Sequence, residues 1–191
     1  MSLDVRALLQ QTGALLSGHF RLSSGLHSAN YVQCALLLEE PFNAKAIGEA
    51  LGARIREMDV QRIVAPALGG VIVGYTVAEA LGLPFIFTER KEGRMTLRRG
   101  FHLSDNERIV IVEDVVTTGR STRETADVIV QHGGDVVGFA SILNRSARAN
   151  PFGPSPYQAL LALDFETYEE SACPLCASGM PLDAPGSRFS K

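Results

Sequence analysis

The stretch from residue 108 to residue 122 constrains the fold of this chain more than any other segment. Residues 109–112 form an unbroken run of β-branched residues, which is typical of a strand buried on both faces of a parallel sheet. Two acids follow, then a loop of threonines and glycine, then the expected start of a helix. There Ser121 is the expected N-cap, and Glu124 completes a capping box. The stretch therefore places polar groups between a buried strand and a helix N-terminus.

The loop and the helix start have the properties of an anion-binding site. Backbone N–H groups at a helix N-terminus carry partial positive charge and bind phosphate groups. Gly119 lets the backbone turn tightly and approach a ligand. Hydroxyl side chains add hydrogen-bond donors, and they belong to Thr117, Thr118, Ser121 and Thr122.

The two acids, Glu113 and Asp114, repel phosphate and must face a different group. Ionised carboxylates only accept hydrogen bonds, and a sugar diol donates them. A ribose 5-phosphate therefore satisfies the acids and the loop together. The stretch lacks the Gly-Lys-Ser/Thr end of a Walker loop and the glycines of the dinucleotide fingerprint. A solvated acidic strand end followed by an ordinary turn remains an alternative on this stretch alone.

Composition allows a single domain and limits its partners. The chain has 191 residues, of which 46% are hydrophobic, enough for one sizeable core over residues 1–191. A net charge of −3 gives no general attraction to nucleic acid or to an anionic membrane. No apolar run approaches the roughly 18 residues of a membrane span. Asp4 and Arg6 argue against a signal peptide, so three cysteines predict a reduced protein in the cytoplasm.

The hydrophobic pattern predicts strands that alternate with helices, and hence an α/β fold with a mostly parallel sheet. The chain is expected to divide into an N-terminal segment at about 1–40, a core at about 41–165 and a C-terminal tail at about 166–191, with an exposed end at 179–191. The predicted helices are 3–16, 41–58, 70–81 and 121–130. The predicted strands are 62–65, 84–88, 109–112, 136–143 and 157–163. A hairpin at 18–33 and a short strand at 101–103 are also predicted.

Residues 112–119, Val-Glu-Asp-Val-Val-Thr-Thr-Gly, resemble the phosphoribosyl-pyrophosphate motif of type I phosphoribosyltransferases. The resemblance implies the fold of that family, a mostly parallel sheet flanked by helices with a small N-terminal hood. It also implies that Glu113 and Asp114 hold the ribose hydroxyls and act in catalysis. The donor contacts that it implies in this stretch are Glu113, Asp114, Val115, Val116, Thr117, Thr118, Gly119, Arg120 and Ser121.

The sequence of residues 18–33 indicates which base the resembled family member would use. Its Phe-x-Leu-x-Ser-Gly, followed by a Ser and an aromatic residue, is similar to the hood of orotate phosphoribosyltransferases. The family's Lys before Ser-Gly is Ser23 here, and its paired aromatics are Tyr31 and Val32. The resemblance implies orotate contacts at Tyr31, Thr117 and Arg145, and a guanidinium binds a carboxylate such as that of orotate in a bidentate manner. On position alone, Arg145 is also compatible with a surface arginine.

Two further segments are expected to bind diphosphate. Residues 66–70 follow a short strand and open a helix, and the resemblance assigns the backbone of Leu68, Gly69 and Gly70 to the leaving group. Residues 89–100 contain five Arg or Lys, a pattern of either a solvated face or a mobile lid. The family's lid begins Arg-Lys-Glu, so Arg90, Lys91 and Arg94 are implied as donor contacts, with Lys91 catalytic. The family's loop His is Thr96 here.

The resemblance implies a pentosyltransferase of pyrimidine biosynthesis that joins orotate to 5-phosphoribosyl 1-diphosphate, giving orotidine 5′-phosphate and diphosphate. It further implies small-molecule substrates, Mg²⁺ bound through the diphosphate with no metal-ligating residue of the protein, and a homodimer whose loop 89–100 reaches the neighbouring site. Two alternatives stay open: transfer to a purine or another base, and a transferase-like domain that regulates by binding nucleic acid.

Cys173 and Cys176 form a Cys-x-x-Cys pair, which is half of a zinc site or a redox pair. A full structural zinc site needs four ligands. Cys34 is remote in the sequence, no histidine is near the pair, and the spacing of the four histidines is not that of a ligand set. The pattern leaves a metal shared between two subunits as an alternative.

Overall fold

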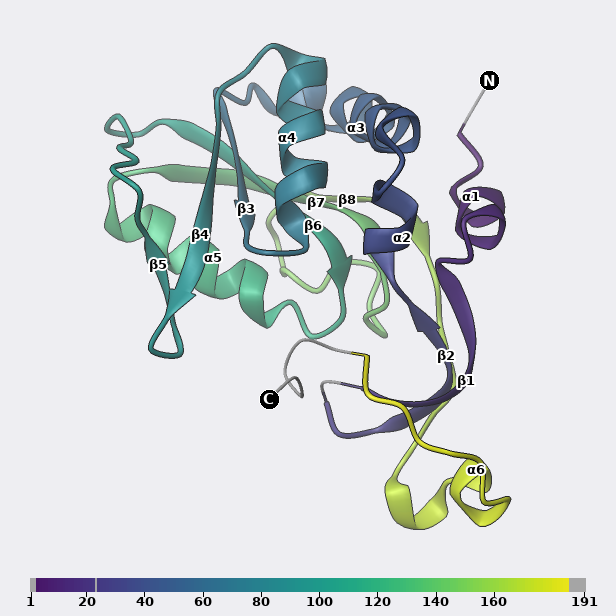
Figure 1. The fold of residues 1–191 in the computed structure, drawn as a ribbon. Coiled ribbons are helices and arrows are strands. Elements are labelled where there is room, and N and C mark those ends of the chain that lie inside the picture. The colour runs from purple at the N-terminus through teal and green to yellow at the C-terminus, as the bar shows by residue number, and fades with distance from the viewer. Residues whose placement is uncertain (1–2, 23, 186–191) are drawn as a thin grey trace.

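The computed structural model describes residues 3–22 and 24–185, and its largest part is a six-stranded sheet in the order β5-β4-β3-β6-β7-β8 (Figure 1). All strands are parallel except β5, which pairs antiparallel with β4 at one edge. Residues 109–112 lie in the interior strand β6 and are fully buried, as expected for a strand covered on both faces. The strands are β3 (Arg62–Pro66), β4 (Phe85–Lys91), β5 (Arg94–Leu97), β6 (Arg108–Val116), β7 (Asp135–Asn144) and β8 (Tyr157–Ala162).

Helices cover both faces of this sheet (Figure 1). α3 (Pro41–Ile55) and α4 (Gly70–Leu81) pack on one face, and α5 (Arg120–Gln131) packs on the other. The short 3-10 turn η1 (Arg56–Met58) follows α3. Each face has its own apolar core, with Ile47 and Leu51 in the first and Ile129 in the second. The predicted α/β fold with a mostly parallel sheet is confirmed.

A second, three-stranded sheet with the order β1-β2-β9 forms the hood. β1 (Leu15–Arg21) and β2 (His27–Val32) make the predicted hairpin, and β9 (Thr167–Tyr168) pairs with β2 from the C-terminal part of the chain. α1 (Val5–Gln11) precedes the hairpin, and α2 (Cys34–Leu38) leads into the core. η2 (Glu170–Ala172) and α6 (Pro174–Ala177) lie at the end of the hood away from the core sheet (Figure 1).

Three predictions about local structure are wrong. The first helix ends at Gln11, because Gly13 adopts a left-handed conformation with φ 66° and the chain then enters β1. Residues 101–103 form no strand. The third, the N-cap of α5, concerns the site. Residues 89–97 belong to a regular β4–β5 hairpin. The described part of the expected exposed end, 179–185, is largely exposed, and Asp183 attaches it to the hood by backbone hydrogen bonds with His19 and Arg21. Within the described ranges, no helix combines the length and apolar character needed to cross a bilayer.

Candidate active site

A cavity of about 470 Å³ opens where the core sheet meets the hood. It lies at the carboxyl ends of β6 and β7, the edge at which open α/β sheets bind ligands. Its walls come from four regions: the hood, the end of β6, the loop into α5, and the segment after β7. Of the predicted site residues, it brings together Tyr31, Glu113, Asp114, Val115, Thr117, Thr118, Gly119, Arg120, Ser121 and Arg145.

The two acids belong to the last part of β6 and line the cavity, where their charges repel each other. Glu113 is only 8% exposed, and its carboxylate accepts a hydrogen bond from the Thr122 hydroxyl. Asp114 accepts one from the backbone N–H of Val115 at 2.8 Å. Burial, and next the nearby charge of Asp114, raise the pKa of Glu113 well above its usual range, and burial also raises the pKa of Asp114. The carboxylates can accept further hydrogen bonds, which a ligand diol would supply.

The loop after β6 leaves the start of α5 with little side-chain capping. Gly119 is the N-cap residue, with φ 69°, and makes no side-chain cap bond. The Thr118 hydroxyl accepts a long hydrogen bond, 3.4 Å, from the backbone N–H of Arg120, the first residue of α5. The guanidinium of Arg123 donates to the carbonyl of Thr118 and holds the loop against the helix. The predicted N-cap Ser121 and its capping box with Glu124 are wrong, because α5 already begins at Arg120. A helix start with a glycine N-cap beside two exposed threonines has the properties of the expected anion site.

Arg145 directly follows β7, and its side chain lines the cavity. Its guanidinium lies 4.5 Å from the centre of the Phe165 ring, a cation–π geometry. The Nε atom is buried and has no hydrogen-bond partner among the described residues. Burial also lowers the pKa of this guanidinium. A buried donor without an acceptor is costly, so the position indicates a ligand that brings one, such as a carboxylate.

Tyr31 reaches the cavity from β2 of the hood. Its ring packs against Phe20, with 5.7 Å between the ring centres. Burial, and next the charge of Asp114, raise its pKa, so the phenol stays protonated and can donate a hydrogen bond. Val32, in the place of the family's second aromatic, is 5% exposed and belongs to the core. Ser23, in the place of the family's Lys, lies outside the described residues.

The predicted diphosphate loop lies between β3 and α4, against the acids. An added Cβ at Gly69 would stand 2.6 Å from a carboxylate oxygen of Asp114, so only glycine fits there. A Cβ at Gly70 would stand 3.2 Å from a carboxylate oxygen of Glu113. The peptide bond between Ala67 and Leu68 is cis. The loop does not line the cavity itself, but it borders the cavity through the two acids.

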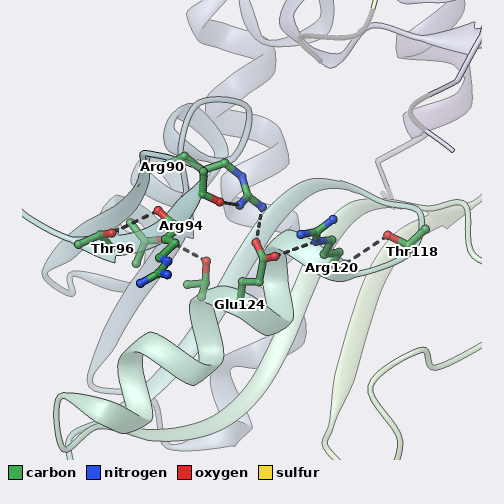
Figure 2. A network of polar contacts seen from close by, with 9 residues as sticks. Arg90, Arg94, Thr96, Thr118, Arg120 and Glu124 are labelled. Atoms are coloured by element: carbon green, nitrogen blue, oxygen red, sulfur yellow. Dashed lines mark hydrogen bonds and ion pairs between the residues drawn. The ribbon is translucent and has the colours of Figure 1, made fainter. Parts of the chain in front are cut away.

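The structure does not bring the basic segment to this cavity. Arg90, Lys91 and Arg94 lie at the tip of the β4–β5 hairpin, and none of them lines the cavity walls. Figure 2 shows that Arg90 and Arg120 both approach the carboxylate of Glu124. Arg90 also donates to the carbonyl of Gly93 at 2.9 Å. The hairpin is thus a regular element attached to α5.

Val116 also departs from its predicted role. Its side chain is 1% exposed in the core, and its carbonyl accepts a hydrogen bond from the backbone N–H of Arg145 at 2.8 Å. Val116 therefore links the ends of β6 and β7 and does not line the cavity.

Sequence reasoning missed several cavity residues that come from other parts of the chain. Phe165 supports the guanidinium of Arg145, and Cys34 begins α2 with a thiol whose pKa burial raises well above its usual range. Phe165 and Cys34 stand in no recognisable motif, so the sequence carries no local signal for them. Two residues already considered from the sequence also line the cavity, the hydroxyl donor Thr122 and Val32. The missed residues are Leu22, Ser24, Leu26, Gln33, Cys34, Ser146, Ala147, Asp164, Phe165 and Thr167, of which Leu22 and Ser24 belong to the hood motif.

Comparison with known proteins agrees with this site. The family model described as "Phosphoribosyl transferase domain" matches residues 37–152. The chain therefore belongs to the phosphoribosyltransferases, a class defined by the cavity's acids and phosphate loop. The orotate phosphoribosyltransferase of Thermotoga maritima is 46% identical over 184 residues, covering 96% of this chain and 98% of that protein. That of Carboxydothermus hydrogenoformans is 46% identical, covering 97% and 98%. Within the class, this chain is a member of the orotate phosphoribosyltransferase family.

Solved structures show the same fold. The Mycobacterium tuberculosis orotate phosphoribosyltransferase, in complex with 5-phospho-alpha-D-ribosyl 1-diphosphate, is 24% identical and superposes with a TM-score of 0.65. The match covers 84% of this chain and 97% of that one. UMP synthase from Leishmania donovani superposes with a TM-score of 0.74 at 20% identity, over 85% of this chain and 36% of that one. The choice that the motif left open, between orotate and another base, is settled for orotate by the relatives at 46% identity.

Proposed function

We propose that the cavity joins orotate to 5-phosphoribosyl 1-diphosphate by dividing the two substrates among three groups of residues. The acids hold the ribose diol, the loop into α5 holds the 5-phosphate, and Arg145 holds the orotate carboxylate. A bond forms between orotate N1 and ribose C1, and the bond from C1 to the diphosphate breaks. The observation that carries this proposal is the convergence of three features on one cavity: the acids, the start of α5 with its glycine N-cap, and Arg145, whose buried Nε has no partner among the described residues.

The acids are suited to the charge that develops on the ribose. As the diphosphate leaves, C1 and the ring oxygen become positive, and a nearby carboxylate pair stabilises that charge. Burial raises the pKa of both Glu113 and Asp114, so the empty site disfavours their ionised forms. Two ribose hydroxyls that donate to these carboxylates would reverse that effect. Substrate binding would therefore prepare the acids for catalysis.

The phosphate loop supplies donors but few cations. Thr117, Thr118 and Ser121 offer hydroxyls, and the glycine N-cap of α5 makes no side-chain cap bond. The 5-phosphate would sit at this helix N-terminus, where the dipole favours an anion. Thr117 would also contact the base, as the resemblance implies. Gly69 and Gly70 would present backbone N–H groups to the diphosphate from the other side of the acids.

Mg²⁺ fits this donor set. Mg²⁺ prefers oxygen ligands and is commonly held by one or two carboxylates together with substrate phosphates. The cavity offers carboxylate oxygens of Glu113 and Asp114 beside the place assigned to the diphosphate. We assign the ion to the diphosphate itself, with the acids close by. When bound, it would neutralise part of the charge on the leaving group.

We further propose that the enzyme is a cytoplasmic homodimer. Arg90, Lys91 and Arg94 do not line their own chain's cavity, so they are available to a neighbouring site. Three large hydrophobic residues, Leu68 just before α4 and Ile72 and Tyr75 within it, stay 85%, 47% and 59% exposed, as expected of a surface that a second copy covers. The three cysteines are free, which suits a reducing compartment.

The test is turnover with a panel of bases. Purified protein with Mg²⁺ and 5-phosphoribosyl 1-diphosphate should consume orotate, followed by its ultraviolet absorbance, and should leave adenine, hypoxanthine and uracil unchanged. Turnover of a purine without turnover of orotate would assign the chain to the other-base enzymes. Tight, salt-dependent binding of RNA without any turnover would assign it to the regulators.

A further inference from the structure

Two histidines of the hood meet the Cys-x-x-Cys pair at one point. His19 lies on β1, His27 begins β2, Cys173 caps α6, and Cys176 lies within it. Their ligand atoms all lie within 4.8 Å of one another. His19, His27 and Cys173 are buried, while Cys176 is exposed. The sequence did not predict this cluster, because the histidines and the cysteines are far apart in the chain; Cys176 and His27 are separated by 149 residues. No histidine is near the cysteine pair in the sequence, but two histidines lie next to it in the folded chain.

Three sulfur–nitrogen distances in this cluster are those of a tetrahedral metal site, and the nitrogen–nitrogen distance is somewhat shorter. With Zn–S bonds of about 2.3 Å and Zn–N bonds of about 2.0 Å, the ligand atoms of a regular tetrahedron stand about 3.3–3.8 Å apart. Nε2 of His19 lies 3.0 Å from Nδ1 of His27. The sulfur of Cys176 lies 3.7 Å and 3.3 Å from these two nitrogens, and that of Cys173 lies 3.6 Å from the first.

Hydrogen bonds cannot account for all the close contacts within the cluster, because four contacts share at most three hydrogens, those of the two thiols and of Nδ1 of His27. Nδ1 of His19 lies 2.8 Å from the carbonyl of Met180, an acceptor, so this nitrogen carries the proton. Nε2 of His19 therefore has a single free lone pair, yet it faces a histidine and two cysteines. A backbone carbonyl that holds the far nitrogen of a histidine is also the usual support of a metal-ligating imidazole.

We propose that His19, His27, Cys173 and Cys176 bind one Zn²⁺ ion as a structural site. Tetrahedral coordination by two sulfurs and two nitrogens favours Zn²⁺ among the common metal ions. Four protein ligands leave no open position for substrate, so the site has a structural role. None of the four residues lines the catalytic cavity, which separates this ion from the Mg²⁺ assigned to the diphosphate.

The ion would hold the C-terminal segment on the hood. Neither η2 nor α6 contains a buried residue, so apolar burial cannot keep these two short helices in place. Apart from the β2–β9 pairing, the segment is attached to the hairpin mainly by backbone bonds at Asp183. A metal cross-link between residues so far apart in sequence restricts the unfolded chain strongly.

The link has a consequence for the active site. His19 and His27 flank the turn of the β1–β2 hairpin, and the described turn residues Leu22, Ser24 and Leu26 line the cavity. An ion bound at the base of this turn would fix the part of the hood that covers the substrates. The site would therefore act as a positioning element for the hood.

Metal analysis of the whole chain tests the proposal directly. The protein is produced without a histidine tag, kept reduced, and dialysed against a weak chelator before elemental analysis. We expect about one zinc ion per chain, as for a structural site with four protein ligands. Cys176→Ser and His27→Gln should lose the ion, whereas Cys34→Ala and His102→Gln, which lie outside the cluster, should keep it. A strong chelator should lower the unfolding midpoint of wild type by about 5–10 °C.

A visible and near-ultraviolet spectrum of the wild-type chain tests the site without any variant, so the result does not depend on whether the variants fold. Replacement of the ion by Co²⁺ should give the visible bands of a tetrahedral site and a thiolate charge-transfer band in the near ultraviolet. Reduced protein that holds less than roughly a tenth of an ion per chain, and that binds no Co²⁺, would overturn the proposal. A Cys173–Cys176 disulfide in protein from the cytoplasm of the producing cells would overturn it as well.

Discussion

The phosphate loop and the hood both enclose the same cavity, but they are built in different ways. The loop follows one strand and opens one helix, so all of its groups come from residues 113–122. The hood is assembled from the β1–β2 hairpin, β9 and the segment around α6 (Figure 1). A site built from one local stretch can be recognised in the sequence, whereas a site built from remote segments can be recognised only in the folded structure.

The two regions also differ in what keeps them in place. β6 and α5 are anchored by two apolar cores of the domain. The end of the hood around η2 and α6 has little apolar burial, and we assign its attachment to the metal-ligand cluster of His19, His27, Cys173 and Cys176. Changes in the loop should therefore affect chemistry, and changes in the hood should affect stability and substrate fit.

The largest effect is expected at Glu113. Glu113→Gln should lower kcat/KM by about 10²–10³-fold, because an ionised group placed at developing charge is lost. Glu79→Gln, an exposed change on α4, is the matched control and should be neutral. Steady-state kinetics with both substrates measures the effect, and a loss below threefold would remove Glu113 from the catalytic groups.

The same variant should be more stable than wild type at neutral pH. Burial raises the folded-state pKa of Glu113 above its unfolded value, so the folded state binds the proton more tightly. Stability then falls as pH rises through the range above the unfolded pKa of about 4.3. Thermal unfolding should show the advantage of Glu113→Gln at pH 8, shrinking as the pH approaches 4. If Glu113→Gln is less stable than wild type at pH 8, burial of the ionised Glu113 carboxylate does not destabilise the folded state.

A smaller effect is expected at Arg145. Arg145→Ala should raise the KM for orotate by roughly 10- to 100-fold, since a hydrogen bond to a charged group contributes about 1.5–3 kcal/mol. The KM for 5-phosphoribosyl 1-diphosphate should change far less. Arg148→Ala, three residues further on and exposed, serves as the control. Equal changes in both KM values would show that Arg145 does not hold the orotate carboxylate.

Metal removal should separate the two regions. Hydrogen exchange measured before and after chelation should become faster in β1, β2 and the segment around α6, while β6 and α5 keep their protection. Orotate KM should rise by about threefold or more, because the turn that lines the cavity loses its support. Uniformly faster exchange across both regions would mean that the hood and the core unfold as one unit.

The smallest effect is expected at Glu124, which links the hairpin to α5 (Figure 2). Glu124→Gln should cost at most about 1 kcal/mol of stability, since both ion pairs are partly exposed. The KM for the donor should change by less than about threefold, because the variant leaves the charges of Arg90 and Arg120 in place. Asp127→Asn on the same helix is the control, and thermal unfolding with kinetics gives both quantities.

Most of the fold could be predicted because the strands and helices follow local hydrophobic patterns. Residues 109–112, α3 and the 18–33 hairpin were all recognisable in this way. The first helix was overextended, because Leu15 and Leu16 fit a helical stripe while Gly13 turns the chain into β1. Ser121 was misplaced as an N-cap, because the left-handed Gly119 is the N-cap two residues earlier.

The site was predictable to the extent that it is local. The acids, the loop and the diphosphate glycines stand in contiguous motifs, whereas Phe165 and Cys34 reach the cavity only through the fold. The basic hairpin lies away from its own cavity, which no local pattern could reveal. The meeting of His19 and His27 with the cysteines depends on β9 and Asp183 bringing the two ends of the chain together.

A crystal structure of the protein with its expected product, orotidine 5′-phosphate, tests the central claim most directly. The account predicts the phosphate at the start of α5, the ribose hydroxyls on Glu113 and Asp114, and the orotate carboxylate on Arg145. Product bound elsewhere on the molecule, or bound in the cavity with its phosphate away from this helix start, would contradict the account.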